Sequence, residues 1–445
     1  MRFIPATCDE QAEMLARVGT PSVDDLFDPI PAGARLTRPL ELSDGLSEIG
    51  LAAHMESLSG RNSHCGSVVS FLGAGCYDHY VPAIVDAVVS KPAFFTAYTP
   101  YQPEVSQGTL QAVYEYQSMI CQLTGMGVSN ASMYDGATAF AEAALMAARV
   151  TKRSRVIVSS TVHPEWIQTL QTYVEAGSLE VATLDVSGGR TDATALAAML
   201  GSDVAAVLVA SPSFYGTLED LAALALLTHQ HGALLVVATN PILLGVLEAP
   251  GVLGADIVVA EGQPLGNTQS FGGPGLGIFA CHADHIRQMP GRVAGRTTDV
   301  DGRTGFVLTF STREQHIRRE KATSNICSNH ALNALAAGVY LSAVGTRGLA
   351  EIGASCVAKA HYLESALITT GRFERVFDAP FAHEFTVRYH GDVGDMQARL
   401  LEKGFLAGLD LGRFRSADEG LVLFAVTEKR TRAQLDRFIG EVEAL

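Results

Sequence analysis

The stretch VAAVLVASPSFYGTLEDLAALALLTHQHGALLVVA, residues 204–238, holds two apolar runs with a helix-like segment between them. Val204–Ala210 and Ala233–Ala238 are continuously apolar, which is typical of strands buried on both faces of a sheet. Asp220–His229 carries the spacing of a helix. A strand, a helix and a second strand in this order predict neighbouring parallel strands with a helix packed on one face.

The same alternation continues on both sides of this unit. Further short β-rich runs lie at Arg155–Ser159, Leu179–Leu184, Ile257–Ala260 and Leu276–Ala280, and helix-like patterns lie at Glu165–Glu175 and Asp192–Leu200. Upstream, Thr109–Leu123 has one apolar helical face and stops at Gly125, and Ala137–Arg149 is alanine-rich and mostly apolar. We therefore predict a three-layer α/β domain with a mostly parallel sheet.

The two ends of the chain differ from this pattern. The beginning reads as short helices and extended linkers, with helical patterns at Asp9–Val18, Ser22–Leu26 and Ser43–Ser57. The end reads as two helices, near Asn329–Val344 and Leu349–Thr369, followed by strand, helix, strand and helix from Phe385 to Leu445. We expect an N-terminal helical arm at 1–65, a large α/β domain at 66–325 and a small C-terminal α/β domain at 326–445.

Composition excludes several classes of function. The chain has 445 residues, 47% of them hydrophobic, so it can bury large cores. Its 32 Lys and Arg against 47 Asp and Glu give a net charge of −15, which argues against nonspecific nucleic-acid binding. Seven cysteines show no CxxC spacing, and no apolar stretch reaches the roughly 18 residues that span a bilayer. No signal-peptide pattern opens the chain, and we expect a reducing, cytoplasmic location without membrane contact.

A stiff polar loop precedes the first long helical pattern. It reads AYTPYQPEVSQG, Ala97–Gly108, and Pro100 and Pro103 preset the backbone at two bends. A loop that displays two tyrosines beside other polar groups is suited to contacting a ligand or a partner. Packing of the tyrosines within the chain is the alternative interpretation.

Three stretches together resemble one family. AYTPYQPEVSQG, then DIVVAEGQPLGNTQSFGGPGLG at Asp256–Gly277, then RQMPGRVAG with EQHIRREKATSNIC at Glu314–Cys327, are similar to glycine dehydrogenase (decarboxylating), the P-protein of the glycine cleavage system, in the family's own order. The length resembles one half of the split form, in which two homologous subunits replace one long polypeptide. The resemblance implies the aspartate-aminotransferase-like fold of fold type I pyridoxal phosphate enzymes.

The resemblance also implies partners and a reaction. In the split enzyme the second subunit carries pyridoxal phosphate, and two copies of each subunit are expected. Glycine is decarboxylated there, and its aminomethyl group passes to the lipoyl group of the H-protein. The first subunit has no pyridoxal phosphate of its own, so we expect no cofactor bound by this chain if it is the first subunit.

The residues agree with the first subunit. The lysine that binds the cofactor in this fold would stand near Gln263, and an amide cannot form an imine. None of the six lysines of the chain lies between residues 153 and 320. The acid that protonates the pyridine nitrogen would stand where Thr239 and Asn240 occur, which are neutral. Asp135 caps the helix whose amides would hold the phosphate, and its charge would repel that phosphate.

No catalytic residue is therefore expected within this chain alone. Candidates for contacts with substrate, lipoyl arm or partner lie on the loop: Tyr98, Thr99, Tyr101, Gln102 and Ser106. Arg318 and Arg319, in a basic stretch of an acidic chain, are candidates for binding a carboxylate or the partner, with intersubunit ion pairs as the alternative. The His, Cys, Asp and Glu residues show no metal-ligand spacing, so no metal site is predicted.

Two other functions stay open at this point. One is a self-sufficient pyridoxal phosphate enzyme that uses an unconventional lysine. The other is a regulatory or binding paralogue that has lost catalysis.

Overall fold

The computed structural model describes residues 6–175, 177, 179–326 and 328–445, which form two compact units divided between Ser63 and His64. Residues 1–5 of the predicted arm, and Cys327 at the end of the third family-like stretch, lie outside the described residues. The predicted boundaries at 65 and 325 stay predictions.

The described residues of the first unit form two helices and a short 3-10 turn: α1 (Cys8–Val18), η1 (Asp24–Phe27) and α2 (Glu48–Ser59). Thr7 and Glu10 form a capping box at the start of α1, and Gly19 ends it in the left-handed conformation at φ 83°. The predicted helix at Ser43–Ser57 was wrong at its start, because the Ser47 hydroxyl accepts the Gly50 N–H and sets the first turn there. None of the described residues of this unit is buried.

The second unit contains a seven-stranded sheet in the described part of the chain, in the order β2-β10-β9-β8-β7-β3-β4. Its strands are β2 (Val128–Ser129), β3 (Arg155–Ser159), β4 (Glu180–Leu184), β7 (Val204–Ala210), β8 (Leu234–Thr239), β9 (Ile257–Glu261) and β10 (Gly277–Cys281). The strands from β4 to β9 are parallel, whereas β10 runs antiparallel to both β9 and β2. The predicted, mostly parallel sheet is confirmed.

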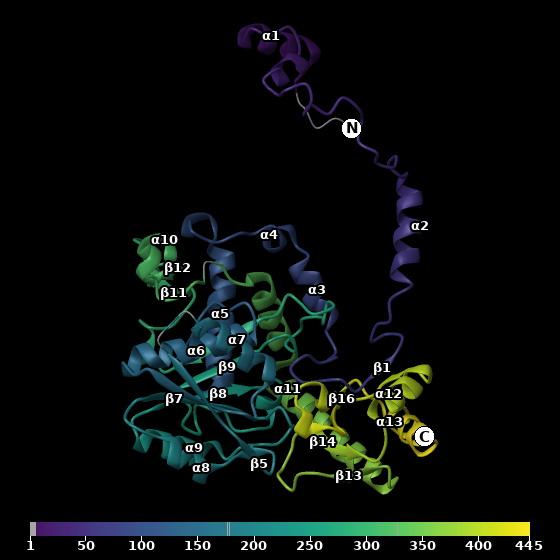
Figure 1. The fold of residues 1–445 in the computed structure, drawn as a ribbon. Coiled ribbons are helices and arrows are strands. Elements are labelled where there is room, and N and C mark those ends of the chain that lie inside the picture. Colours follow the sequence, from purple (N-terminus) through teal and green to yellow (C-terminus); the bar gives the residue numbers. More distant parts are fainter. Residues whose placement is uncertain (1–5, 176, 178, 327) are drawn as a thin grey trace. The chain divides into compact units, whose positions relative to one another are not determined.

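Alternate residues of each central strand enter two different cores. Val207 and Val209 of β7 pack with α5 (Gln107–Thr124), α8 (Ala193–Met199), α9 (Leu221–Gln230) and the first part of α11 (Ala331–Thr369). Ala206 and Leu208 pack with α6 (Gly136–Thr151) and α7 (Pro164–Val174). Because side chains alternate across a strand, a continuously apolar run requires helices on both faces. Figure 1 shows α6 and α7 on one side of the sheet and α8 and α9 on the other.

The last part of the chain forms a smaller sheet with its own core. β13 (Phe373–Arg375), β14 (Glu384–Tyr389), β17 (Leu421–Ala425) and β16 (Leu409–Asp410) are antiparallel and pack on α12 (Val393–Glu402), α13 (Arg432–Glu443) and the end of α11 (Ala331–Thr369). α11 is interrupted at Gly345, where φ is 61° and ψ is 180°. This interruption accounts for the two separate helices that the sequence predicted.

The remaining elements are short. They are β1 (Val69–Ser70) beside β15 (Phe405–Leu406), the hairpins β5 (Val186–Ser187) with β6 (Arg190–Thr191) and β11 (Val293–Thr298) with β12 (Thr304–Thr309), the helices α3 (Ala83–Val89), α4 (Pro92–Phe95) and α10 (Gln315–Arg318), and the 3-10 turns η2 (Pro103–Val105), η3 (Leu243–Gly245), η4 (Ala283–His285), η5 (Ser311–Arg313), η6 (Arg319–Lys321), η7 (Leu411–Arg413) and η8 (Ser416–Asp418). Within the described residues, each helix is too short or too polar to cross a bilayer.

Candidate functional site

A cavity of about 80 Å³ lies where the parallel strands of the large sheet end. Residues that follow the carboxyl ends of β3, β7 and β8 line it, together with residues from the start of β14, and they include His163, Ser213, Asn240, Glu261 and Glu384. Ligands of α/β sheets bind at this edge because the strand ends open into loops there. This cavity is therefore the candidate ligand-binding site of the large domain.

Gln263 follows β9 but is not among the residues that line the cavity. Its buried amide clamps the backbone of Tyr77: the side-chain oxygen accepts the Tyr77 N–H at 2.9 Å, and the nitrogen donates to the Tyr77 carbonyl at 3.2 Å. The same nitrogen donates to the Asn267 carbonyl at 2.8 Å. Gln263 thus has a structural role, holding the loop before α3 against the segment after β9.

Two carboxylates and an indole occupy the N-terminus of α6. Asp135 caps the helix by accepting the Thr138 N–H at 2.7 Å, as predicted. Glu261 accepts the Gly136 N–H at 3.0 Å and also the Gln263 and Leu276 N–H groups at 2.9 and 2.8 Å. A Cβ at Gly136 would lie 2.4 Å from the Trp166 ring, so the indole covers this end closely. Burial raises the pKa of Glu261, although these backbone hydrogen bonds oppose the shift.

Sequence reasoning found Asp135 but missed Glu261. The sequence feature that could have indicated Glu261 is its position at the end of an apolar run, two residues before Gln263. Helix N-terminal amides bind phosphate when they are free. Here carboxylate oxygens already accept from them, and the negative charge would repel a phosphate.

The end of β8 is neutral. The Asn240 side-chain oxygen accepts the Ile242 N–H at 3.0 Å, so the nitrogen faces Nε2 of His383 at 3.2 Å. Burial lowers the pKa of His383 to about 3, with a smaller contribution from His79. His383 is therefore an uncharged imidazole whose Nε2 accepts from Asn240 and whose proton is on Nδ1.

Two more titratable groups line the cavity. Burial lowers the pKa of His163 to about 4, and its Nδ1 accepts the Glu165 N–H at 3.1 Å at the start of α7. Burial raises the pKa of Glu384 to about 7, while its hydrogen bonds from the Ala74 N–H at 2.7 Å and the Tyr77 hydroxyl at 2.8 Å oppose that shift. The sequence carried no signal for Glu384, which reaches the cavity from the C-terminal sheet.

These residues do not fit pyridoxal phosphate, the cofactor that the resemblance implies for the family's enzyme. Gln263, which the sequence predicts near the place of the cofactor lysine, offers an amide that is already bonded to the Tyr77 backbone. A second amide, Asn240, stands at the end of β8 where an acid is needed, and Asp135 and Glu261 already accept from the α6 amides. The arrangement supplies neither an imine-forming nitrogen nor a phosphate cradle.

The loop at 97–108 is held by a buried arginine. It contains the 3-10 turn η2, and α5 begins at Gln107, so the loop is shorter than predicted. Arg292 donates to the Thr99 hydroxyl at 3.2 Å and the Tyr101 hydroxyl at 3.0 Å, and it pairs with Glu314 at 3.3 Å. The structure therefore brings Thr99 and Tyr101 together, at Arg292 and away from the residues that line the cavity.

The other candidate residues are mostly at the surface. Tyr98 is 81% exposed, Gln102 is exposed, and Ser106 precedes α5 without a side-chain cap bond. Arg318 and Arg319 are exposed, and Arg318 donates to the Thr312 carbonyl at 3.1 Å. The packing interpretation thus holds in part for Tyr101 and not for Tyr98.

Comparison with known proteins gives one consistent result. The family model described as "Glycine cleavage system P-protein" matches residues 1–442. The chain is 51% identical over 441 residues to "Probable glycine dehydrogenase (decarboxylating) subunit 1" of Geobacillus kaustophilus, covering 99% of this chain and 98% of that protein. It is 47% identical over 445 residues to the protein of the same name from Moorella thermoacetica, with both covered completely.

Solved structures agree with the sequence relatives. A crystal structure of glycine decarboxylase (P-protein) of the glycine cleavage system, in inhibitor-bound form, superimposes with a TM-score of 0.91 at 42% identity and covers 100% of both chains. A Lactobacillus brevis glutamate decarboxylase superimposes with a TM-score of 0.68 at 12% identity over 93% of this chain and 95% of that chain, a likeness of fold alone. The predicted fold type I architecture is confirmed.

Proposed function

The chain belongs to the glycine cleavage system P-protein family, and from that premise we propose that it is the subunit of a two-subunit glycine dehydrogenase (decarboxylating) that holds no cofactor itself. It is an enzyme component of the glycine cleavage system. The name of its relatives, subunit 1, supports a partner subunit 2. In this proposal subunit 2 supplies the pyridoxal phosphate, and two copies of each subunit assemble.

The observation that carries the proposal is the occupied end of α6. The Glu261 carboxylate accepts from Gly136 where the cofactor's phosphate would need that N–H, and Gln263 is bonded to Tyr77 and Asn267 instead of offering an amine. Restoring the site would require changes at several residues, so a single unusual lysine would not make this chain a self-sufficient enzyme. The lysines outside the interval 153–320 do not line the cavity either.

The chain's contribution would then be made at a surface. The loop with Tyr98, Thr99, Tyr101, Gln102 and Ser106 is the proposed contact with glycine, the lipoyl arm of the H-protein or subunit 2. Its anchor at Arg292 holds the loop before binding, which lowers the entropic cost of recognition. Arg318 in α10 and Arg319 in η6 are exposed cations that follow Glu314, the ion-pair partner of Arg292. They are proposed to meet a carboxylate or acidic partner surface. A cytoplasmic location completes the proposal, with the described cysteines free.

Reconstitution tests the proposal. The chain and subunit 2 are purified separately and together, and visible absorbance and glycine-dependent exchange of labelled bicarbonate are measured with lipoylated H-protein. We expect absorbance in subunit 2 and in the complex, and exchange in the complex. A cofactor band that borohydride bleaches in the isolated chain would contradict the proposal, and so would a complex without exchange.

A further inference from the structure

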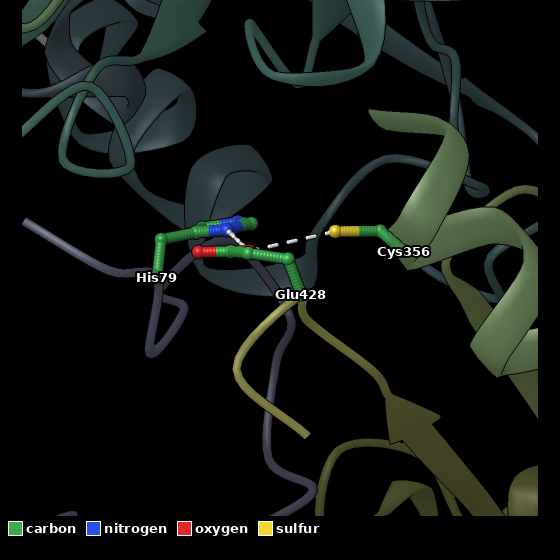
Figure 2. Close-up of side chains that lie close together, drawn as sticks. All are labelled: His79, Cys356 and Glu428. Carbon is green, nitrogen blue, oxygen red and sulfur yellow. Dashed lines mark hydrogen bonds and ion pairs between the residues drawn. The ribbon is translucent and has the colours of Figure 1, made fainter. Parts of the chain in front are cut away.

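Three side chains of types that can bind a metal ion converge at α11 from distant parts of the chain (Figure 2). His79 follows β1, Cys356 lies in α11, and Glu428 follows β17. The His79 Nδ1 lies 2.6 Å from Glu428 Oε2, and the Cys356 Sγ lies 3.6 Å from the same oxygen. The three ligand atoms all lie within 4.8 Å of one another.

The cluster is enclosed but reachable. The side chain of His79 is 2% exposed and that of Glu428 is 15% exposed, while Cys356 is fully buried. Glu428 also lines a cavity of about 490 Å³ together with Tyr80, Tyr340, Ile352 and Lys429. This cavity offers an entry path and room for a water molecule beside the cluster.

Polar atoms around the cluster are incompletely satisfied within the described part of the chain. Nε2 of His79 and the hydroxyl of Tyr340 are buried without a hydrogen-bond partner there. Glu428 Oε1 accepts the Tyr80 N–H at 2.7 Å, which orients the carboxylate and leaves Oε2 directed at His79 and Cys356. Outer hydrogen bonds of this kind orient metal-binding carboxylates.

The basic side chains beside the cluster each have a partner within the chain. Lys429 and Arg430 both pair with Asp78, at 2.5 and 2.6 Å. Lys359 donates to the backbone carbonyl of Glu428 at 2.5 Å. A thiolate and a carboxylate would together balance a divalent ion.

We propose that His79, Cys356 and Glu428 bind one zinc ion, with a water molecule as the fourth ligand. Imidazole, thiolate and carboxylate are the ligand types that zinc accepts in tetrahedral sites. On binding, the Cys356 S–H bond breaks, a Zn–S bond forms, and that proton leaves to solvent. The proton between His79 Nδ1 and Glu428 Oε2 moves to Nε2 of His79, so that Nδ1 and Oε2 can both bind the ion. The ion would cross-link the segment after β1, the middle of α11 and the segment after β17.

Sequence spacing could not reveal this site. Glu428 lies 349 residues from His79 and 72 from Cys356. The prediction of no metal site considered only the spacing of ligand residues along the sequence. These three residues are close together in space but far apart in the sequence.

Zinc titration of the full-length chain tests the proposal. Chelator-stripped protein is titrated with Zn²⁺ in competition with a chromophoric chelator, with proton release followed in weak buffer. We expect one equivalent of zinc and one proton released per ion. Cys356→Ser is expected to weaken binding by about 100-fold or more, since losing even an outer partner of a zinc ligand costs about 10- to 100-fold.

Cys65→Ser is the matched control, because Cys65 is a free, half-buried thiol whose Sγ bonds Gln269 instead. It should bind zinc as the unaltered chain does. Co²⁺ bound to the unaltered chain should give a thiolate-to-cobalt absorption band, a readout that does not depend on a variant folding. Absence of stoichiometric zinc, unchanged binding in Cys356→Ser, or loss of binding in Cys65→Ser would each overturn the proposal and leave His79 and Glu428 as a hydrogen-bonded pair.

Discussion

At the scale of single residues, Gln263 allows a direct test of the proposal that this chain binds no cofactor. Its amide bonds the Tyr77 backbone and Asn267, while Glu261 and Trp166 occupy the neighbouring helix end. We predict that the Gln263→Lys variant will not bind stoichiometric pyridoxal phosphate, because the new amine would lack a neighbouring phosphate-binding site. Absorbance after mixing and gel filtration checks this, with subunit 2 as the positive control. A stable band that borohydride reduces would show that the lysine alone was missing.

Glu384 makes the stability of the chain depend on pH. Burial raises its pKa from 4.5 to about 7, so the folded state holds a proton that the unfolded state releases between these values. Its contribution is therefore fully present below pH 4.5 and is lost as pH rises to about 7. Glu384→Gln should remove this slope, which is at most about 1.4 kcal/mol per pH unit. Urea unfolding between these pH values checks it, and equal slopes in both proteins would contradict it.

Substitution of Tyr98 and Tyr101 should show whether their hydroxyl groups bind a substrate or partner or only stabilise the loop. Tyr98 is 81% exposed, so Tyr98→Phe should change the free energy of unfolding by less than about 0.5 kcal/mol. Tyr101→Phe removes an acceptor of Arg292 and should cost about 1 kcal/mol. If their hydroxyls contact substrate or partner, each variant should lower exchange in the assembled enzyme about tenfold, equivalent to about 1.4 kcal/mol.

Tyr389→Phe, on the C-terminal sheet, is the control for these exchange measurements. Normal exchange in both loop variants would make the loop a packing element.

At the scale of elements, α11 depends on Gly345. Its φ of 61° and ψ of 180° fall in a region that is nearly restricted to glycine, and a Cβ there would meet no atom within 4 Å. Gly345→Ala should therefore destabilise the chain through backbone strain alone, by about 1–3 kcal/mol.

Gly338→Ala is the matched control for that prediction, since Gly338 is helical and a Cβ there would lie 3.9 Å from the nearest side chain, that of Tyr116. It should be neutral or stabilising by up to about 1 kcal/mol. Chemical denaturation followed by circular dichroism compares the two. Equal effects would mean that α11 tolerates a straight path through residue 345.

At the scale of the whole molecule, the N-terminal unit should be separable. None of its described residues is buried, and several apolar side chains are exposed, among them Leu36, Leu42 and Ile49. We predict that deletion of residues 1–63 will leave the melting temperature of the remaining chain unchanged within a few degrees. Deletion should weaken co-purification with subunit 2, because exposed apolar surface favours a partner. A large loss of stability, or undiminished association, would contradict these expectations.

The sequence by itself determined the order of strands and helices, since a period of two or of 3.6 and residues such as Asp135 and Gly125 act locally. It also showed that no lysine lies between residues 153 and 320, because the composition of a segment can be read without knowing the fold. The tertiary structure decided which distant groups meet: Glu261 at α6, Glu384 in the cavity, Arg292 under the loop, and His79 with Cys356 and Glu428. Those contacts join residues that lie tens to hundreds of positions apart in the sequence. Local sequence patterns could not predict them, because the distances between such residues are set by the packing of the whole chain.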